Sequence, residues 1–111
     1  GEWPLYWMHR MDDDHKFTDH AIFKEHGMGS IEHYPSYYMR KNCWYSVESD
    51  EGDMTRIVEE LGVDRLLFAS DYPHFDSEYP NTVPDLMQRN DITPKDKEMI
   101  FSKNAEVLLN L

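Results

Sequence analysis

The fold of this chain is decided by residues 66–76, which read LLFASDYPHFD. The run from Leu66 to Ala69 is continuously apolar, as expected for a strand that is buried on both faces. Pro73 cannot donate a backbone hydrogen bond to a sheet, so the strand must end near Asp71. We therefore predict that Asp71 lies at the carboxyl end of a buried parallel strand, where α/β proteins place ligands and catalytic groups.

The segment before this strand completes a predicted strand–helix–strand unit. Residues 43–47 are rich in aromatic and β-branched side chains, which favours a strand that leads into Glu48. Apolar residues recur at helical spacing between the two strands, at Met54, Ile57, Val58 and Leu61. We predict that Ser49 or Asp50 caps this helix, that Gly62 ends it, and that the two strands are parallel.

The remaining segments predict helices around this unit. Helical patterns cover residues 3–25, 35–41, 84–89 and 94–101. Thr93 and Asp96 have the spacing of a capping box, with a proline at the first helical position. Ser102 is predicted to cap a last helix whose inward-facing residues are Ala105, Leu108 and Leu109.

Length, charge and cysteine content exclude several classes of protein. The chain has 111 residues, a formal net charge of −11 and a pI of about 4.8. This acidity argues against nucleic acid or an anionic membrane surface as a partner. The sequence contains no apolar run of the length of a membrane span. The single cysteine, Cys43, excludes an internal disulfide and favours a cytoplasmic location.

Three residues at the predicted carboxyl ends of the strands are candidates for a functional site. The strand-end carboxylate of Asp71 is suited to bind a metal and accept a proton, although an aspartate here can also simply cap the turn. His74, three residues later, is either a contact of the site or an exposed loop histidine. Glu48 reaches the same edge, or is an acid favoured by the dipole of the helix that follows. Asp76 is interpreted as a turn or capping residue.

Two further features are weighed in the same way. Trp3, Tyr6, Trp7 and Arg10 form an aromatic and basic stripe at helical spacing. Such a stripe is more often a packing surface than a binding site, and packing is our leading interpretation. The histidines outside residues 66–76 lack the spacing of a zinc-binding motif.

The stretch LLFASDYPHFD resembles the last barrel strand of metal-dependent amidohydrolases of the amidohydrolase-2 type, which include TIM-barrel hydrolases and nonoxidative decarboxylases. The final residues, FSKNAEVLLNL, are similar to the closing helix of that group. Residues 1–12 and 35–51 resemble the segments before its last two strands. The resemblance implies an α/β fold in which residues 1–111 are a single incomplete domain. This domain is the C-terminal portion of a (β/α)8 TIM barrel, because a complete barrel needs about 250 residues.

The resemblance also implies a function. Members of the group hold a divalent metal, with zinc as the ion we expect, through a His-x-His motif, a histidine on a middle strand and this strand-end aspartate. Only the aspartate has a counterpart here, so Asp71 is the implied metal ligand and catalytic residue. The implied reaction is hydrolysis or nonoxidative decarboxylation, a lyase reaction, of a small carboxylated or cyclic substrate, with Trp7 and Arg10 beside the substrate opening.

The same resemblance implies that further strands, from outside this chain, complete the barrel. Two strands cannot close a barrel, so we expect the missing N-terminal part of the barrel or another subunit as a partner, and an oligomer in solution. A noncatalytic α/β fragment that serves interaction or assembly is the alternative function. Metal binding by the purified chain distinguishes the two.

Overall fold

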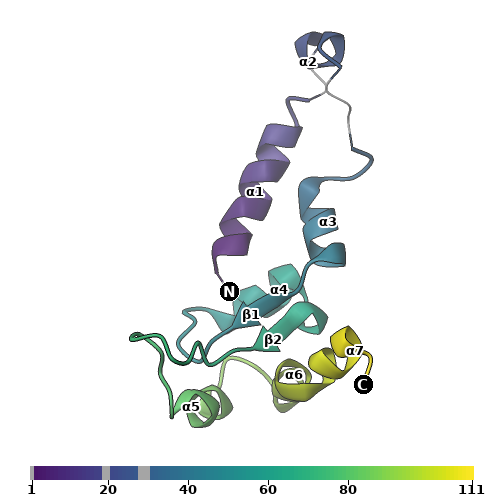
Figure 1. Ribbon diagram of the computed structural model, residues 1–111. Coiled ribbons are helices and arrows are strands. Elements are labelled where there is room, and N and C mark those ends of the chain that lie inside the picture. The colour runs from purple at the N-terminus through teal and green to yellow at the C-terminus, as the bar shows by residue number, and fades with distance from the viewer. Residues whose placement is uncertain (1, 19–20, 28–30) are drawn as a thin grey trace. The chain divides into compact units, whose positions relative to one another are not determined.

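A computed structural model describes residues 2–18, 21–27 and 31–111 (Figure 1). The chain divides into two compact units, residues 3–43 and residues 44–111, with Glu2 belonging to the second. The helices are α1 (Trp3–His15), α2 (Ala21–Glu25), α3 (Pro35–Asn42), α4 (Met54–Leu61), α5 (Thr82–Gln88), α6 (Pro94–Glu98) and α7 (Asn104–Leu109). The strands and shorter turns are β1 (Tyr45–Val47), η1 (Val63–Arg65), β2 (Leu66–Phe68) and η2 (Met99–Lys103).

The unit of residues 3–43 consists of helices, and α1 packs against α3. The backbone N–H of Ser36, at the start of α3, donates to the Asp12 carboxylate at 2.9 Å. The prediction of one helix over residues 3–25 is wrong, because α1 ends at His15 and a turn follows. The hydroxyl of Thr18 donates to the His15 carbonyl at 2.7 Å. This bond gives a partner to a carbonyl that the end of α1 leaves without one inside the helix. Residues 19–20 lie outside the described ranges.

The aromatic stripe of α1 is exposed. Trp3, Tyr6 and Trp7 are 64%, 66% and 50% exposed, whereas the buried side chains of this helix are Pro4, Leu5 and Met8. The interpretation of the stripe as a packing surface is therefore wrong for this structure. Helical spacing alone could not distinguish the two faces, because both carry large apolar side chains.

The unit of residues 44–111 is built on the predicted strand–helix–strand arrangement. β1 and β2 are parallel, and Tyr45, Ser46 and Val47 pair with Leu66, Leu67 and Phe68. In the view of Figure 1 the strands lie between α4 and the segment α6–α7. Both strands are shorter than predicted, since β1 begins at Tyr45 and β2 ends at Phe68. The prediction that the second strand is buried on both faces is wrong, because Leu66 is buried but Leu67 and Phe68 are half-buried. The guanidinium of Arg65, in the turn η1, lies 5.1 Å from the ring centre of Trp44.

The helix α4 starts later than predicted. Its cap is Asp53, whose carboxylate accepts from the Arg56 backbone N–H at 2.9 Å, so the prediction of Ser49 or Asp50 is wrong. Ser49 and Asp50 lie in a turn, and the buried Ser49 hydroxyl has no hydrogen-bond partner in the described part of the chain. Gly62 ends the helix with φ of 91°, as predicted.

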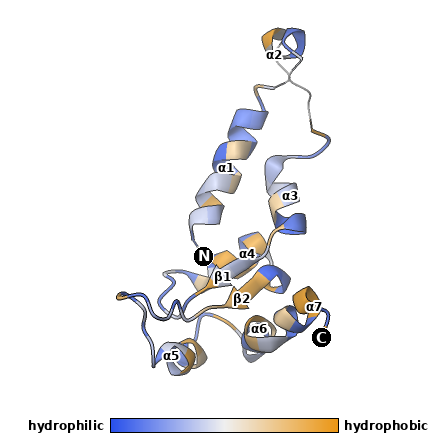
Figure 2. Ribbon diagram, viewed as in Figure 1, coloured by the Kyte–Doolittle hydropathy of each residue, from blue (hydrophilic) through white to orange (hydrophobic). Residues whose placement is uncertain are grey.

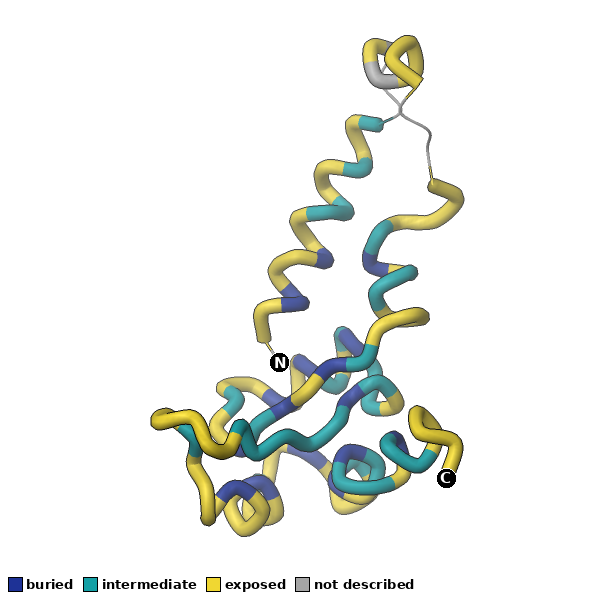
Figure 3. Tube along the Cα trace, in the orientation of Figure 1, coloured by how far each residue is buried: buried dark blue, intermediate teal, exposed yellow. Residues whose placement is uncertain are grey.

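The core of this unit is formed by the strands, α4 and the C-terminal helices. Figure 3 shows buried residues on each of these elements, and long exposed stretches in the connection from β2 to α5. The fully buried apolar side chains of the unit include Val47, Met54, Ile57, Leu61, Leu66, Leu86 and Ile100. The unit is therefore α/β, with two parallel strands in the described part.

The C-terminal helices confirm one predicted cap and contradict another. Thr93 and Asp96 form the predicted capping box at the start of α6. Ser102 is not a cap, because it lies in the π-helical turn η2, through which the helix continues into α7. A π-helical turn inserts an extra residue and rotates the following face, and the inward residue of α7 is Asn104. Leu108 and Leu109, which are predicted to face inward, are 44% and 63% exposed.

The last helix, α7, therefore carries several exposed apolar side chains. Figure 2 shows hydrophobic residues on α7, close to the C-terminus. Val107 and Leu111 are 70% and 88% exposed. Among the helices of the described ranges, none combines the length and the apolar character that crossing a membrane requires.

Candidate functional site

The candidate site begins where β2 ends. The backbone N–H of Ala69 still donates to the Val47 carbonyl at 2.9 Å, and the chain then leaves the sheet. Asp71 has φ of 54°, in the left-handed region that few residues other than glycine adopt. Aspartate is among the residues that tolerate this conformation. Such backbone conformations cluster at functional sites, so this one is a reason to consider a functional role for Asp71.

The loop that carries Asp71 is held by hydrogen bonds of its own. The backbone N–H of His74 donates to the Asp71 carbonyl at 2.9 Å. The hydroxyl of Ser77 donates to the Ser70 carbonyl at 2.5 Å and accepts from the Tyr79 backbone N–H at 3.2 Å. These bonds hold the loop in a compact turn, although its side chains are mostly exposed.

Asp71 and His74 are hydrogen-bonded to each other in this loop. The Nδ1 atom of His74 lies 2.8 Å from Oδ2 of Asp71, with the two side chains 69% and 37% exposed. The hydrogen bond to Asp71 raises the pKa of His74, and the negative charges of Asp71, Asp76 and Glu48 act in the same direction. His74 is thus held toward Asp71 by this hydrogen bond although its side chain is largely exposed, and its contact with a functional site stays a prediction.

Asp76 joins this pair, which its interpretation as a turn residue did not anticipate. Asp71, His74 and Asp76 each offer a ligand atom, and the three atoms lie within 4.8 Å of one another. Two carboxylate oxygens and an imidazole nitrogen are a donor set that zinc and other divalent cations accept, and three protein ligands are the usual number at a catalytic zinc. The donor set therefore fits a divalent cation. The spacing of three acceptors within one six-residue loop is the signal that could have identified Asp76.

Glu48 lies at the same edge of the sheet. It directly follows β1, whose last residue Val47 pairs with Phe68, so Glu48 and Asp71 both leave the carboxyl ends of neighbouring parallel strands. Burial raises the pKa of Glu48, and the charges of Asp71, Asp50 and Glu51 raise it further. The negative charge of Asp71 is therefore one of the causes that raise the pKa of Glu48.

The pairing of His74 makes a testable prediction about pH. The pKa of His74 in the folded chain should lie above the ordinary value of 6.5, and Asp71→Asn should lower it. The contribution of this pair to stability is then fully present below the pKa of the unfolded chain and disappears as pH rises through the folded pKa. The measurement is an NMR titration of the imidazole protons. Equal titration curves in the wild type and in Asp71→Asn would contradict the pairing.

The other predicted residues, Trp7 and Arg10, lie on α1 in the unit of residues 3–43. Arg10 pairs with Asp14 at 3.2 Å, four residues along the same exposed helix face. Their contact with a substrate stays a prediction. Sequence reasoning also missed Arg89 and Asp91, which contact the turn after β1 and carry no recognisable motif.

The comparison with known proteins gives the family. The model of the amidohydrolase family, Amidohydro_2, matches residues 14–111, which include both strands and the whole candidate site. Comparison with curated proteins returns no match. Since the matched residues are most of the sequence, the chain belongs to the amidohydrolase family.

Proposed function

We propose that this chain is the C-terminal part of a metal-dependent amidohydrolase that hydrolyses or decarboxylates a small carboxylated or cyclic substrate. The observation that carries the proposal is the grouping of Asp71, His74 and Asp76 in the loop that follows the parallel strand β2. In α/β barrels this end of the strands carries the catalytic residues. Membership of the amidohydrolase family supports a hydrolase or decarboxylase reaction.

The residues of the loop would hold a divalent cation, zinc being the one we expect. Such a cation, when bound, lowers the pKa of water and polarises carbonyl groups. Asp71 and Asp76 supply negative charge for it, and His74 fixes the orientation of the Asp71 carboxylate through Nδ1. Asp71 is then also the residue that accepts a proton from the reacting group.

Glu48 is the proposed proton donor at this edge. Its raised pKa means that it keeps its proton to a higher pH than an ordinary glutamate does. Acid and base roles are commonly divided between carboxyl groups whose environments differ. Glu48 is half-buried beside β1, whereas Asp71 lies in the loop with a histidine partner. We assign Glu48 the role of acid and Asp71 the role of base.

The barrel itself belongs to the proposal. The described part of the chain holds two strands, and a TIM barrel has eight. The other strands would come from a missing N-terminal part or from another subunit. They would also supply the histidines that the family uses beside the aspartate.

A zinc titration of the full chain followed by NMR tests the proposal. The side-chain carboxyl signal of Asp71 and the ring signals of His74 should shift together as zinc is added. Asp64 is the internal control, because it is exposed, pairs with Arg65 at 3.4 Å and precedes β2 rather than following it. Equal shifts at Asp64 and Asp71, or none at millimolar zinc, would contradict the metal site.

The alternative of a noncatalytic assembly fragment rests on a different observation. The exposed apolar side chains of α7 and the exposed Tyr72, Phe75 and Tyr79 of the loop form surfaces that another protein part could cover. Phe75 is 100% exposed. A chain that binds no zinc and self-associates would favour this alternative.

A further inference from the structure

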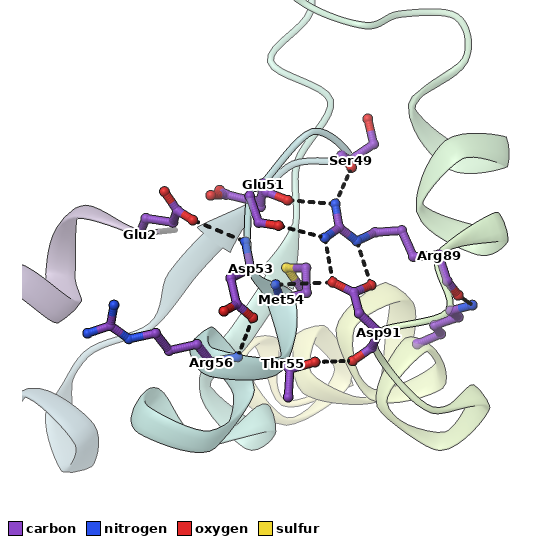
Figure 4. Close-up of polar contacts among 11 residues, drawn as sticks. Glu2, Ser49, Glu51, Asp53, Met54, Thr55, Arg56, Arg89 and Asp91 are labelled. Atoms are coloured by element: carbon purple, nitrogen blue, oxygen red, sulfur yellow. Dashed lines mark hydrogen bonds and ion pairs between the residues drawn. The ribbon is translucent and has the colours of Figure 1, made fainter.

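Arg89 binds the turn that follows β1 (Figure 4). Its Nη1 atom donates to the carbonyl oxygens of Ser49, at 3.0 Å, and Glu51, at 2.6 Å. Its Nη2 atom donates to the Gly52 carbonyl at 3.4 Å. One guanidinium from the end of α5 therefore contacts three carbonyls of the segment between Glu48 and α4.

Asp91 holds this guanidinium in place. Its two carboxylate oxygens accept from Nε and Nη2 of Arg89 at 2.9 and 2.6 Å, a bidentate arrangement. The same carboxylate accepts from the Met54 backbone N–H at 3.3 Å, and the Asp91 carbonyl accepts from the Thr55 hydroxyl at 2.6 Å. Asp91 is thus bound both to Arg89 and to the first turn of α4.

The pair is partly shielded from solvent. The side chains of Arg89 and Asp91 are 17% and 34% exposed. The hydrogen bonds from Arg89 lower the pKa of Asp91, against the opposing effect of burial. A charged pair of this kind is stronger than a fully exposed one, and breaking it leaves a desolvated charge unpaired.

The two cations that line the groove beside this pair are engaged with protein groups. It has a volume of about 530 Å³ and is lined in part by Thr55, Arg89, Asp91 and Lys97. Its Lys97 ammonium donates to the Met87 and Arg89 carbonyls, at 2.7 and 2.5 Å. The guanidinium of Arg89 is bound to the turn and to Asp91. Both cations are therefore engaged with the protein, which favours a role in holding the backbone.

We propose that Arg89 and Asp91 are positioning residues that hold the turn after β1, and with it Glu48, at the strand edge occupied by Asp71. The turn begins directly after Glu48, so the backbone that carries this side chain is fixed by the sheet on one side and by Arg89 on the other. The benefit for catalysis rests on the proposed roles of Glu48 and Asp71. The proposal that Arg89 and Asp91 hold the turn does not depend on those roles.

The test replaces Arg89 with lysine in the full chain. Lysine keeps the positive charge but cannot reproduce a planar fork that binds carbonyls and a carboxylate together. Hydrogen exchange of the backbone amides of residues 50–54 should become at least about tenfold faster, because this segment opens locally. The pKa of Glu48, measured from its side-chain carboxyl carbon, should fall as water reaches it. The amides of β2 should keep their exchange rates.

The matched control is Arg56→Lys. Arg56 lies in the neighbouring α4, and its side chain is 55% exposed. Its guanidinium pairs with the Glu60 carboxylate at 2.7 Å, four residues along the same helix, rather than with the turn after β1. This variant should change neither the exchange rates nor the Glu48 pKa. If Arg89→Lys does not fold, Asp91→Asn should give the same local pattern, because it removes the charge that orients Arg89.

Two outcomes would overturn the proposal. One is that Arg89→Lys and Arg56→Lys behave alike, and the other is that exchange rises uniformly over the whole unit. Neither measurement involves a metal or turnover. A chain that binds no zinc would therefore count against the metal site of the loop and leave the positioning role intact. Unchanged amide exchange of residues 50–54 in Arg89→Lys would overturn the positioning role and leave the metal site untouched.

Discussion

Replacing Asp71 with asparagine is expected to lower metal-dependent turnover at least about a hundredfold, in line with the contribution of a general base. Asparagine keeps the shape of the side chain and tolerates the left-handed backbone at this position, so the chain should remain folded. It lacks the negative charge that binds a cation and accepts a proton. Turnover, bound zinc and melting temperature should be measured together, in an enzyme with a complete barrel.

The control for this variant is Asp64→Asn. Asp64 is an exposed aspartate in η1, before β2, where it pairs with the adjacent Arg65 at 3.4 Å. Its replacement should leave turnover and zinc content unchanged. Near-normal turnover in a folded and zinc-loaded Asp71→Asn protein would reduce Asp71 to a residue of the turn.

Replacing Asn104 with alanine should lower the free energy of unfolding by about 1–3 kcal/mol, the usual cost of a buried polar group that loses its partner. Asn104 is 1% exposed, and its Nδ2 atom donates to the Val63 carbonyl at 2.7 Å and the Leu66 carbonyl at 2.8 Å. Alanine removes this donor from the Leu66 carbonyl in β2, whereas the Val63 carbonyl in η1 keeps the Leu66 backbone N–H as a donor. Urea unfolding of the full chain measures the change.

The matched control for this prediction is Asn81→Ala. Asn81 is exposed at the start of α5 and makes no side-chain capping bond. The free energy of unfolding should therefore change by less than about 0.5 kcal/mol, as for ordinary surface positions. Similar losses in the two variants would show that the Asn104 amide does not support β2.

Local patterns predicted the elements that depend on local contacts. The capping box of Thr93 and Asp96 is confirmed because its bonds join residues three apart. The end of α4 at Gly62 is confirmed for a similar reason, since the left-handed backbone there suits glycine. The start of α4 was mispredicted because the turn before it is held by Arg89, about forty residues away in sequence, as the pairs in its hydrogen bonds show.

In the candidate site, too, the contacts between residues close in sequence were easier to predict than the others. The contact of Asp71 with His74 spans three residues and is implied by a short loop after a strand. Glu48 and Asp71 lie at the same edge of the sheet because β1 and β2 are parallel. The strand–helix–strand pattern of the sequence indicates this parallel pairing. Asp76 was overlooked although its spacing from Asp71 and His74 within one short loop could have indicated that the three side chains meet. The exposure of Leu108 and Leu109 was also unpredictable, because the π-helical turn that shifts their face has no recognised sequence signal.

The left-handed backbone at Asp71 limits how this position can change during evolution. Asparagine and glycine both accept φ of 54°, but neither carries a carboxylate. Glutamate keeps the carboxylate, but its longer side chain offers no local hydrogen bond that eases this conformation. The substitutions that the backbone tolerates best are thus those that remove the negative charge. A descendant of this chain could therefore lose the proposed metal ligand in one step and keep its fold.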